Sequence, residues 1–132
     1  MIVFDASTLV SAALKVDSVP ERALLLAEES DVFALSEAVL VEIAEVLRRP
    51  KFARAIPAAR RERILEILQR DAVWFKPAML ITDYRDQKDN KYLELAPAAG
   101  AETIVSSDDD LLTLHPWRGI RVLRPAEYLS LF

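Results

Sequence analysis

Short apolar runs alternate along the chain with longer segments whose apolar residues recur at helical spacing. The runs predict buried strands, and the longer segments predict amphipathic helices. Because the strands read as continuous apolar stretches, they predict a parallel sheet covered on both faces. We therefore expect an α/β fold, a three-layer α/β/α sandwich with a central parallel sheet, in a single domain over residues 1–132. The predicted strands are 2–4, 32–35, 73–75, 103–106 and 120–123, and the predicted helices are 6–15, 21–29, 37–49, 57–70, 87–99, 109–114 and 125–131.

Capping and breaking residues define the ends of these helices. Ser36 is the expected N-cap of the helix 37–49, and Pro50 is expected to stop it. Gly100 is expected to terminate the helix 87–99. Pro97 lies inside that helix, so the helix should either kink or end early.

Composition narrows the possible chemistry. The 132 residues contain no cysteine, which excludes disulfides, thiolate metal sites and cysteine nucleophiles. No apolar stretch approaches the roughly 20 residues of a membrane span, and Asp5 interrupts the first apolar run, so we expect a cytoplasmic protein. The formal net charge of −4 means that any nucleic-acid site must be local.

Two acids, Asp5 and Asp108, lie within two residues of the end of a predicted strand. Ligands of open parallel sheets bind in the crevice at the carboxyl ends of the strands, near the point where the strand order reverses. If both strands are central, the two side chains share that crevice. Each acid could instead simply cap the helix that follows it. For both acids together, the functional interpretation is favoured.

Helical geometry separates two acids in the segment 37–49. At about 100° per residue, Glu42 lies about 40° outside Val46, on the flank of the apolar stripe, whereas Glu45 points into solvent. A carboxylate at the border of a buried face can reach a crevice. The alternative is that Glu42 is an ordinary surface acid, and helical geometry alone does not decide between the two.

The other candidate acids precede or open short helices. Asp86 is explained as a helix cap, whereas Asp89 shares a helical face with Leu93 and Ala96, where a carboxylate is costly unless it is paired or bound to a metal. Asp108–Asp110 concentrates three acids, of which Asp109 is expected to be solvated. Oxygen ligands without histidine or cysteine suit Mg²⁺ or Mn²⁺. The single histidine, His115, is interpreted as structural or incidental rather than as a general base.

In their order along the chain, these segments resemble the PIN-domain family, in particular its small single-domain toxins of toxin–antitoxin pairs. The resemblance implies a Mg²⁺- or Mn²⁺-dependent ribonuclease of parallel-sheet α/β fold. It assigns metal-ligand and catalytic roles to Asp5, Glu42, Asp89 and Asp108, with Asp110 as a possible fifth ligand. The stretches that carry it are 3–12, 35–52, 85–96 and 99–112.

Two positions depart from the pattern of that family. Ser7 stands where the family often has asparagine, although serine can still hydrogen-bond a metal-bound water or a phosphate. The turn before the last acid reads Ser106-Ser107-Asp108 and lacks the usual glycine.

The expected partners follow from charge and apolar surface. The segment 48–63 holds seven basic residues and a single acid. Arg48, Arg49 and Lys51 could therefore contact RNA phosphates. A solvated helix face explains individual residues as well. The apolar N-terminal helices and the residues 128–132 could form a homodimer face or a groove for a cognate antitoxin, and core packing is the simpler alternative.

Two other functions compete with the nuclease. A phospho-accepting receiver-type domain also carries acids at strand ends, but it needs an acid pair after the first strand and a lysine after the last. This chain has one acid, Asp5, and Arg124-Pro125 at those places. A non-catalytic member of the nuclease fold that binds RNA or a protein partner is the second alternative.

Overall fold

The computed structural model describes residues 1–78, 81 and 90–132, and the fold is given for these. All pairings of strands are parallel, as predicted. β1 (Ile2–Phe4) pairs with β4 (Thr103–Val105), which pairs with β5 (Arg121–Leu123), and β2 (Ala34–Leu35) pairs with β3 (Val73–Trp74). A parallel bridge between Ile2 and Phe33 joins the two groups, so the strands follow the order β3-β2-β1-β4-β5.

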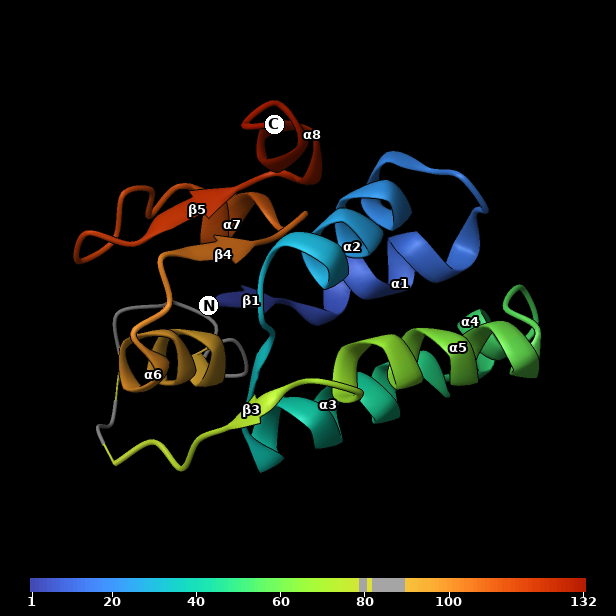
Figure 1. Ribbon diagram of the computed structural model, residues 1–132. Coiled ribbons are helices and arrows are strands. Elements are labelled where there is room, and N and C mark those ends of the chain that lie inside the picture. Colours follow the sequence, from blue (N-terminus) through green and yellow to red (C-terminus); the bar gives the residue numbers. More distant parts are fainter. Residues whose placement is uncertain (79–80, 82–89) are drawn as a thin grey trace.

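Helices cover this sheet in the three-layer α/β/α arrangement that the apolar strands predicted. In Figure 1, β1 lies between α6 and the pair formed by α1 and α2. The helices are α1 (Ala6–Leu14), α2 (Val19–Ser30), α3 (Glu37–Leu47), α4 (Pro50–Ala53), α5 (Ala58–Gln69), α6 (Asn90–Ala99), α7 (Asp109–Leu112) and α8 (Pro125–Leu129). None of the helices in the described ranges is long and apolar enough to cross a membrane.

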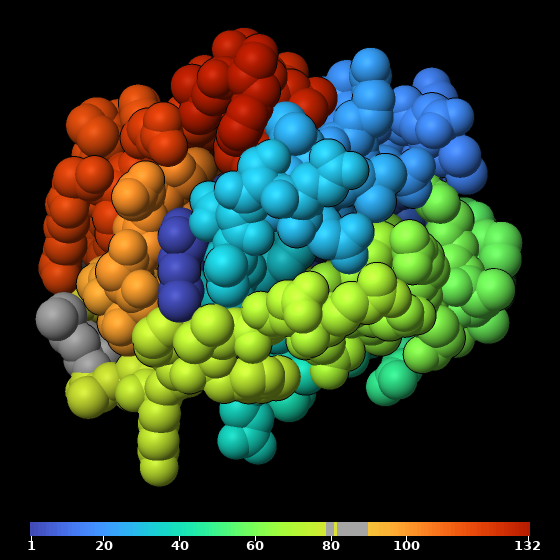
Figure 2. Space-filling view, in the orientation of Figure 1, coloured from blue at the N-terminus to red at the C-terminus, as the bar shows by residue number. Residues whose placement is uncertain are grey.

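The central strands are enclosed, whereas the β3 edge is open. Every residue of β1 and of β4 is buried. On the face shown in Figure 2, the darkest blue, at the N-terminus, is visible as a narrow strip between cyan and orange segments. β3 differs from the buried strand that its apolar run predicted, because Val73 and Trp74 are 40% and 50% exposed at the edge of the sheet.

The predicted caps at Ser36 and Gly100 are confirmed, whereas α3, α7 and α8 each end two residues before their predicted ends. Ser36 caps α3 by accepting a hydrogen bond from the Val39 N–H at 3.2 Å. Gly100 ends α6 with a φ of 63°, a left-handed conformation that glycine adopts at little cost. Pro97 does not end the helix early, since α6 continues to Ala99. Pro50 stops α3 but also opens the short helix α4, which the sequence did not predict.

One member of the basic segment ties three helices together. Arg60 of α5 donates from Nε to the Ala13 carbonyl oxygen at 2.7 Å and from Nη2 to the Ala12 carbonyl oxygen at 2.6 Å. The same guanidinium forms an ion pair with Glu21 of α2. Carbonyl groups at the C-terminal end of a helix lack partners within the helix, so Arg60 supplies the missing donors for α1. Its role in the structure is therefore architectural.

Replacing Arg60 with methionine should lower the free energy of unfolding by about 2 to 3 kcal/mol, because the substitution leaves the Glu21 carboxylate and two carbonyl oxygens without their donor. Urea denaturation followed by circular dichroism measures this change. The matched control is Arg63→Met, at an exposed position of the same helix, which should change the free energy by less than about 0.5 kcal/mol. Equal effects of the two substitutions would contradict the structural role of Arg60.

Candidate functional site

The strand order reverses between β1 and β4, and Asp5 and Asp108 follow these two strands. β1 connects through α1 and α2 to β2 on one side, whereas β4 lies on its other side. Asp5 comes directly after β1, and its N–H donates to the Val105 carbonyl oxygen at 3.1 Å. Asp108 comes three residues after β4. The condition that both strands are central and adjacent is met, and the crevice expected at such a reversal lies where the two acids are.

Asp5 is a buried carboxylate held by neutral donors. It is only 4% exposed. Its Oδ1 accepts from the Thr8 N–H at 3.0 Å and from the Ser7 hydroxyl at 2.8 Å, and its Oδ2 accepts from the Ser106 hydroxyl. The bond from Thr8 makes Asp5 the N-cap of α1, so the capping role considered from the sequence is present. Capping uses Oδ1 and does not explain why the whole group is buried.

Burial dominates the electrostatics of this group. It raises the pKa of the Asp5 carboxyl above its ordinary value, although the hydrogen bonds from Ser106, Thr8 and Ser7 lower that pKa in part. Within the described ranges, every hydrogen-bond partner of the Asp5 side chain is neutral. The ionised carboxylate therefore carries a desolvation penalty that a cation would offset.

Ser106 links the two strand-end acids, although it was not among the residues expected at the site. Its hydroxyl donates to Asp5 and accepts from the Asp108 N–H at 2.9 Å. Ser7 reinforces the link, because its hydroxyl accepts from the Ser107 N–H at 3.3 Å. Phe4 pairs with Val105, so the next register position sets Asp5 level with Ser106. This register is set by the pairing of distant segments, so the sequence alone carried no signal for the role of Ser106.

Asp108 opens the short helix α7 beside this link. It is partly buried, and its Oδ1 accepts from the Asp110 N–H at 2.9 Å, which makes it the N-cap. Asp110 is exposed in the same turn. Asp109 is also exposed, as predicted, and forms an ion pair with Arg124 at 2.9 Å.

His115 has a structural role, as predicted, because its Nδ1 accepts from the Val122 N–H at 2.9 Å. That bond fixes the loop before β5 to the strand itself.

Glu42 faces the interior, whereas Glu45 is exposed, which confirms the distinction drawn from helical angle. The Glu42 side chain is 16% exposed. Its Oε1 accepts from the Tyr92 hydroxyl at 2.7 Å, and its Oε2 forms an ion pair with Lys91. The Tyr92 hydroxyl also accepts from the Ala6 N–H at 3.0 Å. Burial first, and then the charges of Glu42 and Asp5, raise the pKa of Tyr92, so that it remains a neutral donor.

A cavity of about 520 Å³ between α1, α3 and α4 unites several candidate residues. Ser7, Glu42, Arg49 and Lys51 line it together. Arg48 does not; it lines a separate hollow on the outer side of α3. Arg49 and Lys51 thus lie beside Glu42, whereas Arg48 lies away from it.

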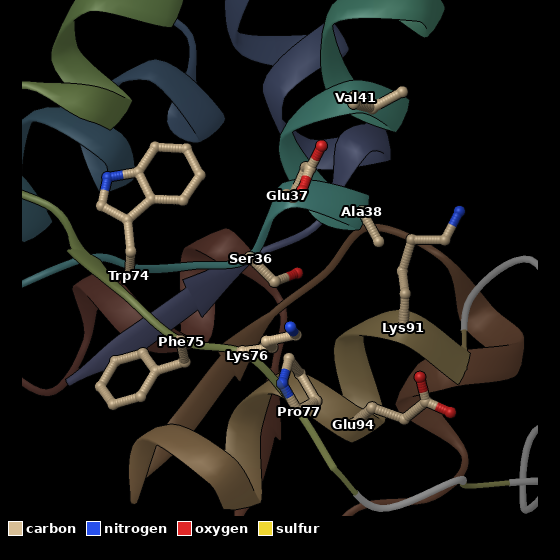
Figure 3. Close-up of a pocket in the computed structure, with 10 residues that line it drawn as sticks. All are labelled: Ser36, Glu37, Ala38, Val41, Trp74, Phe75, Lys76, Pro77, Lys91 and Glu94. Atoms are coloured by element: carbon tan, nitrogen blue, oxygen red, sulfur yellow. The ribbon is translucent and has the colours of Figure 1, made fainter.

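A second cavity of about 780 Å³ lies between the start of α3, the chain after β3 and α6. In Figure 3, Lys91 reaches from α6 toward α3 beside Ala38, and Trp74 lies on the far side of the pocket. None of Asp5, Glu42 and Asp108 lines this cavity. We therefore place the candidate chemistry in the crevice of the carboxylates rather than here.

The described acids do not by themselves make up a metal site. Asp86 and Asp89 lie outside the described residues, so their assignments stay predictions. Among the residues described, no group of three or more acids or histidines is arranged to hold a metal ion. The donor chemistry nevertheless fits a hard cation, because Asp5, Glu42 and Asp108 offer oxygen atoms alone. A ligand from the segment that contains Asp89 would be needed to complete the set.

Comparison with known proteins identifies the family of this chain. The family model described as the PIN domain matches residues 1–110. Among solved structures, PAE2754 from Pyrobaculum aerophilum is similar with a TM-score of 0.60 at 16% identity, over 98% of this chain and 88% of that one. VapBC2 from Rickettsia felis, bound to a DNA fragment from their promoter, is similar with a TM-score of 0.55 at 15% identity, over 92% of this chain and 97% of that one. The search of curated proteins gives no match. Since the family match spans most of the sequence and the fold agrees with it, the chain belongs to the PIN-domain family.

Proposed function

We propose that this protein is a Mg²⁺- or Mn²⁺-dependent ribonuclease that cleaves RNA phosphodiester bonds. The observation that carries the proposal is the buried Asp5 carboxylate, which stands at the reversal of strand order and has neutral partners alone in the described part of the chain. Asp108 and Asp89 are the further proposed ligands, with Glu42 completing the acidic site and Asp110 as a possible fifth ligand. PIN domains are generally nucleases, and membership of the family favours this function over a receiver-type domain.

The proposed chemistry follows from the donor set. A divalent cation held by carboxylates lowers the pKa of a bound water and stabilises the attacking and leaving oxygens of phosphodiester cleavage. Oxygen ligands favour Mg²⁺ or Mn²⁺ over softer metals. The protein residues supply a fixed arrangement: hydroxyls of Ser7 and Ser106 hold Asp5, and Ser106 also holds the backbone of Asp108.

The biological role that we propose is the toxin of a toxin–antitoxin pair, acting in the cytoplasm. Support comes from the likeness in fold to VapBC2 of Rickettsia felis and from the match to the family along most of the chain. An RNA substrate, a cognate antitoxin and a homodimer belong to the same proposal. The backbone of the RNA would lie along the cavity beside Arg49 and Lys51, because phosphate contacts position a strand without reading its sequence.

Cleavage of a fluorescent single-stranded RNA by the purified protein should require Mn²⁺ or Mg²⁺ and stop with a chelator. Asp5→Asn and Asp108→Asn should each reduce the rate at least about 100-fold, because each removes a carboxylate that holds the cation. Glu42→Gln should also reduce it, whereas the matched control Glu45→Gln, an exposed acid on the same helix, should cleave at the wild-type rate. Cleavage by Asp5→Asn at the wild-type rate, after removal of contaminating nucleases, would exclude the assignment.

The raised pKa of Asp5 predicts a pH-dependent stability. The folded protein binds the Asp5 proton more tightly than the unfolded chain, so this group destabilises the fold progressively as pH rises from the ordinary aspartate range through the raised folded-state pKa. At pH 7 without metal, Asp5→Asn should therefore raise the thermal midpoint by at least about 2 °C, and the gain should vanish below pH 4. The control Asp71→Asn, at an exposed position, should show no such dependence. A loss of stability in Asp5→Asn at pH 7 would refute the desolvation argument.

The basic side of the cavity should affect substrate binding rather than chemistry. Arg49→Ala and Lys51→Ala should each raise the KM for RNA with little change in kcat, because phosphate contacts contribute equally to binding of substrate and transition state. A plot of the logarithm of the RNA binding constant against the logarithm of salt concentration should also become shallower by about 0.7 in slope for each substitution. Arg63→Ala, on the exposed face of α5, serves as the control. An unchanged salt slope in both variants would place the RNA elsewhere.

A further inference from the structure

The carboxylate of Glu42 is held by two consecutive residues of α6. Both of its oxygens are engaged, Oε1 by the Tyr92 hydroxyl at 2.7 Å and Oε2 by the ammonium group of Lys91. Figure 3 shows the Lys91 side chain directed from α6 toward α3. α3 carries Glu42, so the contact crosses from one helix to another rather than forming within a single helix. The orientation of Glu42 therefore depends on the first turn of α6.

Tyr92 joins this carboxylate to the backbone beside Asp5. Its side chain is completely buried, and its hydroxyl donates to Glu42 while it accepts from the Ala6 N–H at 3.0 Å. Ala6 is the residue after Asp5, so one hydroxyl connects the Glu42 carboxylate to the peptide that follows Asp5. Because the phenol ring has only two torsions and is packed on all sides, the hydroxyl is a rigid spacer.

Lys91 adds charge to the same contact. Its side chain is 24% exposed and that of Glu42 is 16% exposed, so the pair is largely withdrawn from water. Ionised carboxylates that converge on one crevice repel one another. A divalent cation would balance two of the negative charges of Asp5, Glu42 and Asp108, and Lys91 balances the charge of Glu42. Lys91 thus offsets the charge of Glu42 whether or not a cation is bound.

We propose that Lys91 and Tyr92 are positioning residues that hold the Glu42 carboxylate at a fixed place relative to Asp5 and adjust the charge of the metal site. This inference rests on the proposed function. The two residues act through Glu42 and do not themselves contact the metal or the RNA. Tyr92 sets the geometry, and Lys91 sets the balance between affinity for the cation and orientation of Glu42.

The test measures Mn²⁺ binding by titration calorimetry and by electron paramagnetic resonance, alongside turnover of RNA at saturating Mn²⁺. Tyr92→Phe should weaken Mn²⁺ binding about tenfold, in the range that is usual when a partner of a metal ligand is lost. The matched control is Tyr128→Phe, because the buried hydroxyl of Tyr128 has no hydrogen-bond partner among the described residues. This control should bind Mn²⁺ as the wild type does.

Removal of the Lys91 charge is expected to change Mn²⁺ affinity in the opposite direction from Tyr92→Phe. Lys91→Met should bind Mn²⁺ about three- to tenfold more tightly, because the crevice loses a positive charge. Its turnover at saturating Mn²⁺ should fall at least about tenfold, because Glu42 loses its orienting partner. Lys91→Arg retains the charge and should restore the wild-type affinity, and Lys15→Met, at an exposed position, is the control. If Lys91 had only a structural role, Lys91→Met would lower the thermal midpoint without moving Mn²⁺ affinity and RNA turnover in opposite directions.

A double-substitution cycle tests whether Tyr92 acts through Glu42. In a Glu42→Gln background, Tyr92→Phe should have little further effect on Mn²⁺ affinity, because the group that it positions is already altered. Circular dichroism of each variant shows whether it is folded. If Tyr92→Phe alone is unstable, the decisive comparison is between Glu42→Gln and the double variant.

The outcomes distinguish the two proposals. If the wild type binds no Mn²⁺ and cleaves no RNA, the proposed function fails and the positioning role fails with it. If the wild type binds Mn²⁺ but Tyr92→Phe binds it as tightly as Tyr128→Phe does, the positioning role of Tyr92 alone is overturned. Weaker Mn²⁺ binding by Lys91→Met, or unchanged turnover, would overturn the role of Lys91.

Discussion

The Asp5 carboxylate is buried at the end of the central strand, and in the described residues only hydroxyls and a backbone N–H bind it. This placement requires the rest of the crevice to be arranged around it. Ser7 must donate from the first turn of α1, and Ser106 must donate from the adjacent strand end while it also accepts from the backbone of Asp108. The hydrogen bonds lower the desolvation cost without removing it, and a divalent cation would remove more of it. Burial of the ionised Asp5 carboxylate is therefore unfavourable in itself, which is the kind of local cost that functional sites commonly carry.

Much of this arrangement follows from local sequence signals. Continuous apolar runs identified buried parallel strands, and the ends of two of them located Asp5 and Asp108. Helical periodicity separated Glu42 from Glu45 correctly, because the angle around α3 decides which side chain faces inward. Ser36 was predictable as a cap because the signal lies within three residues of the bond that it makes. Such features depend on near neighbours in the chain.

The features that the sequence did not predict depend on contacts between distant segments. Ser106 meets Asp5 only because β4 pairs with β1 in a particular register, and Lys91 meets Glu42 only because α6 packs beside α3. Arg60, a member of the basic segment 48–63, instead donates to carbonyl oxygens at the C-terminal end of α1. The exposure of Val73 has the same origin, since an apolar run does not reveal whether its strand lies at the centre or at the edge of a sheet. Charge and hydropathy indicate what kind of contact a side chain can make, whereas the packing of distant segments determines which residue it contacts.

The proposed function requires a divalent cation in the crevice at the ends of β1 and β4. A crystal of the protein soaked in Mn²⁺, measured at a wavelength where manganese scatters anomalously, tests it directly. We expect an anomalous peak within about 2.0 to 2.6 Å of carboxylate oxygens of Asp5 and Asp108, with Asp89 completing the ligands. Strong Mn²⁺ peaks elsewhere on the molecule, with none beside Asp5 at saturating Mn²⁺, would show that this crevice is not a metal site.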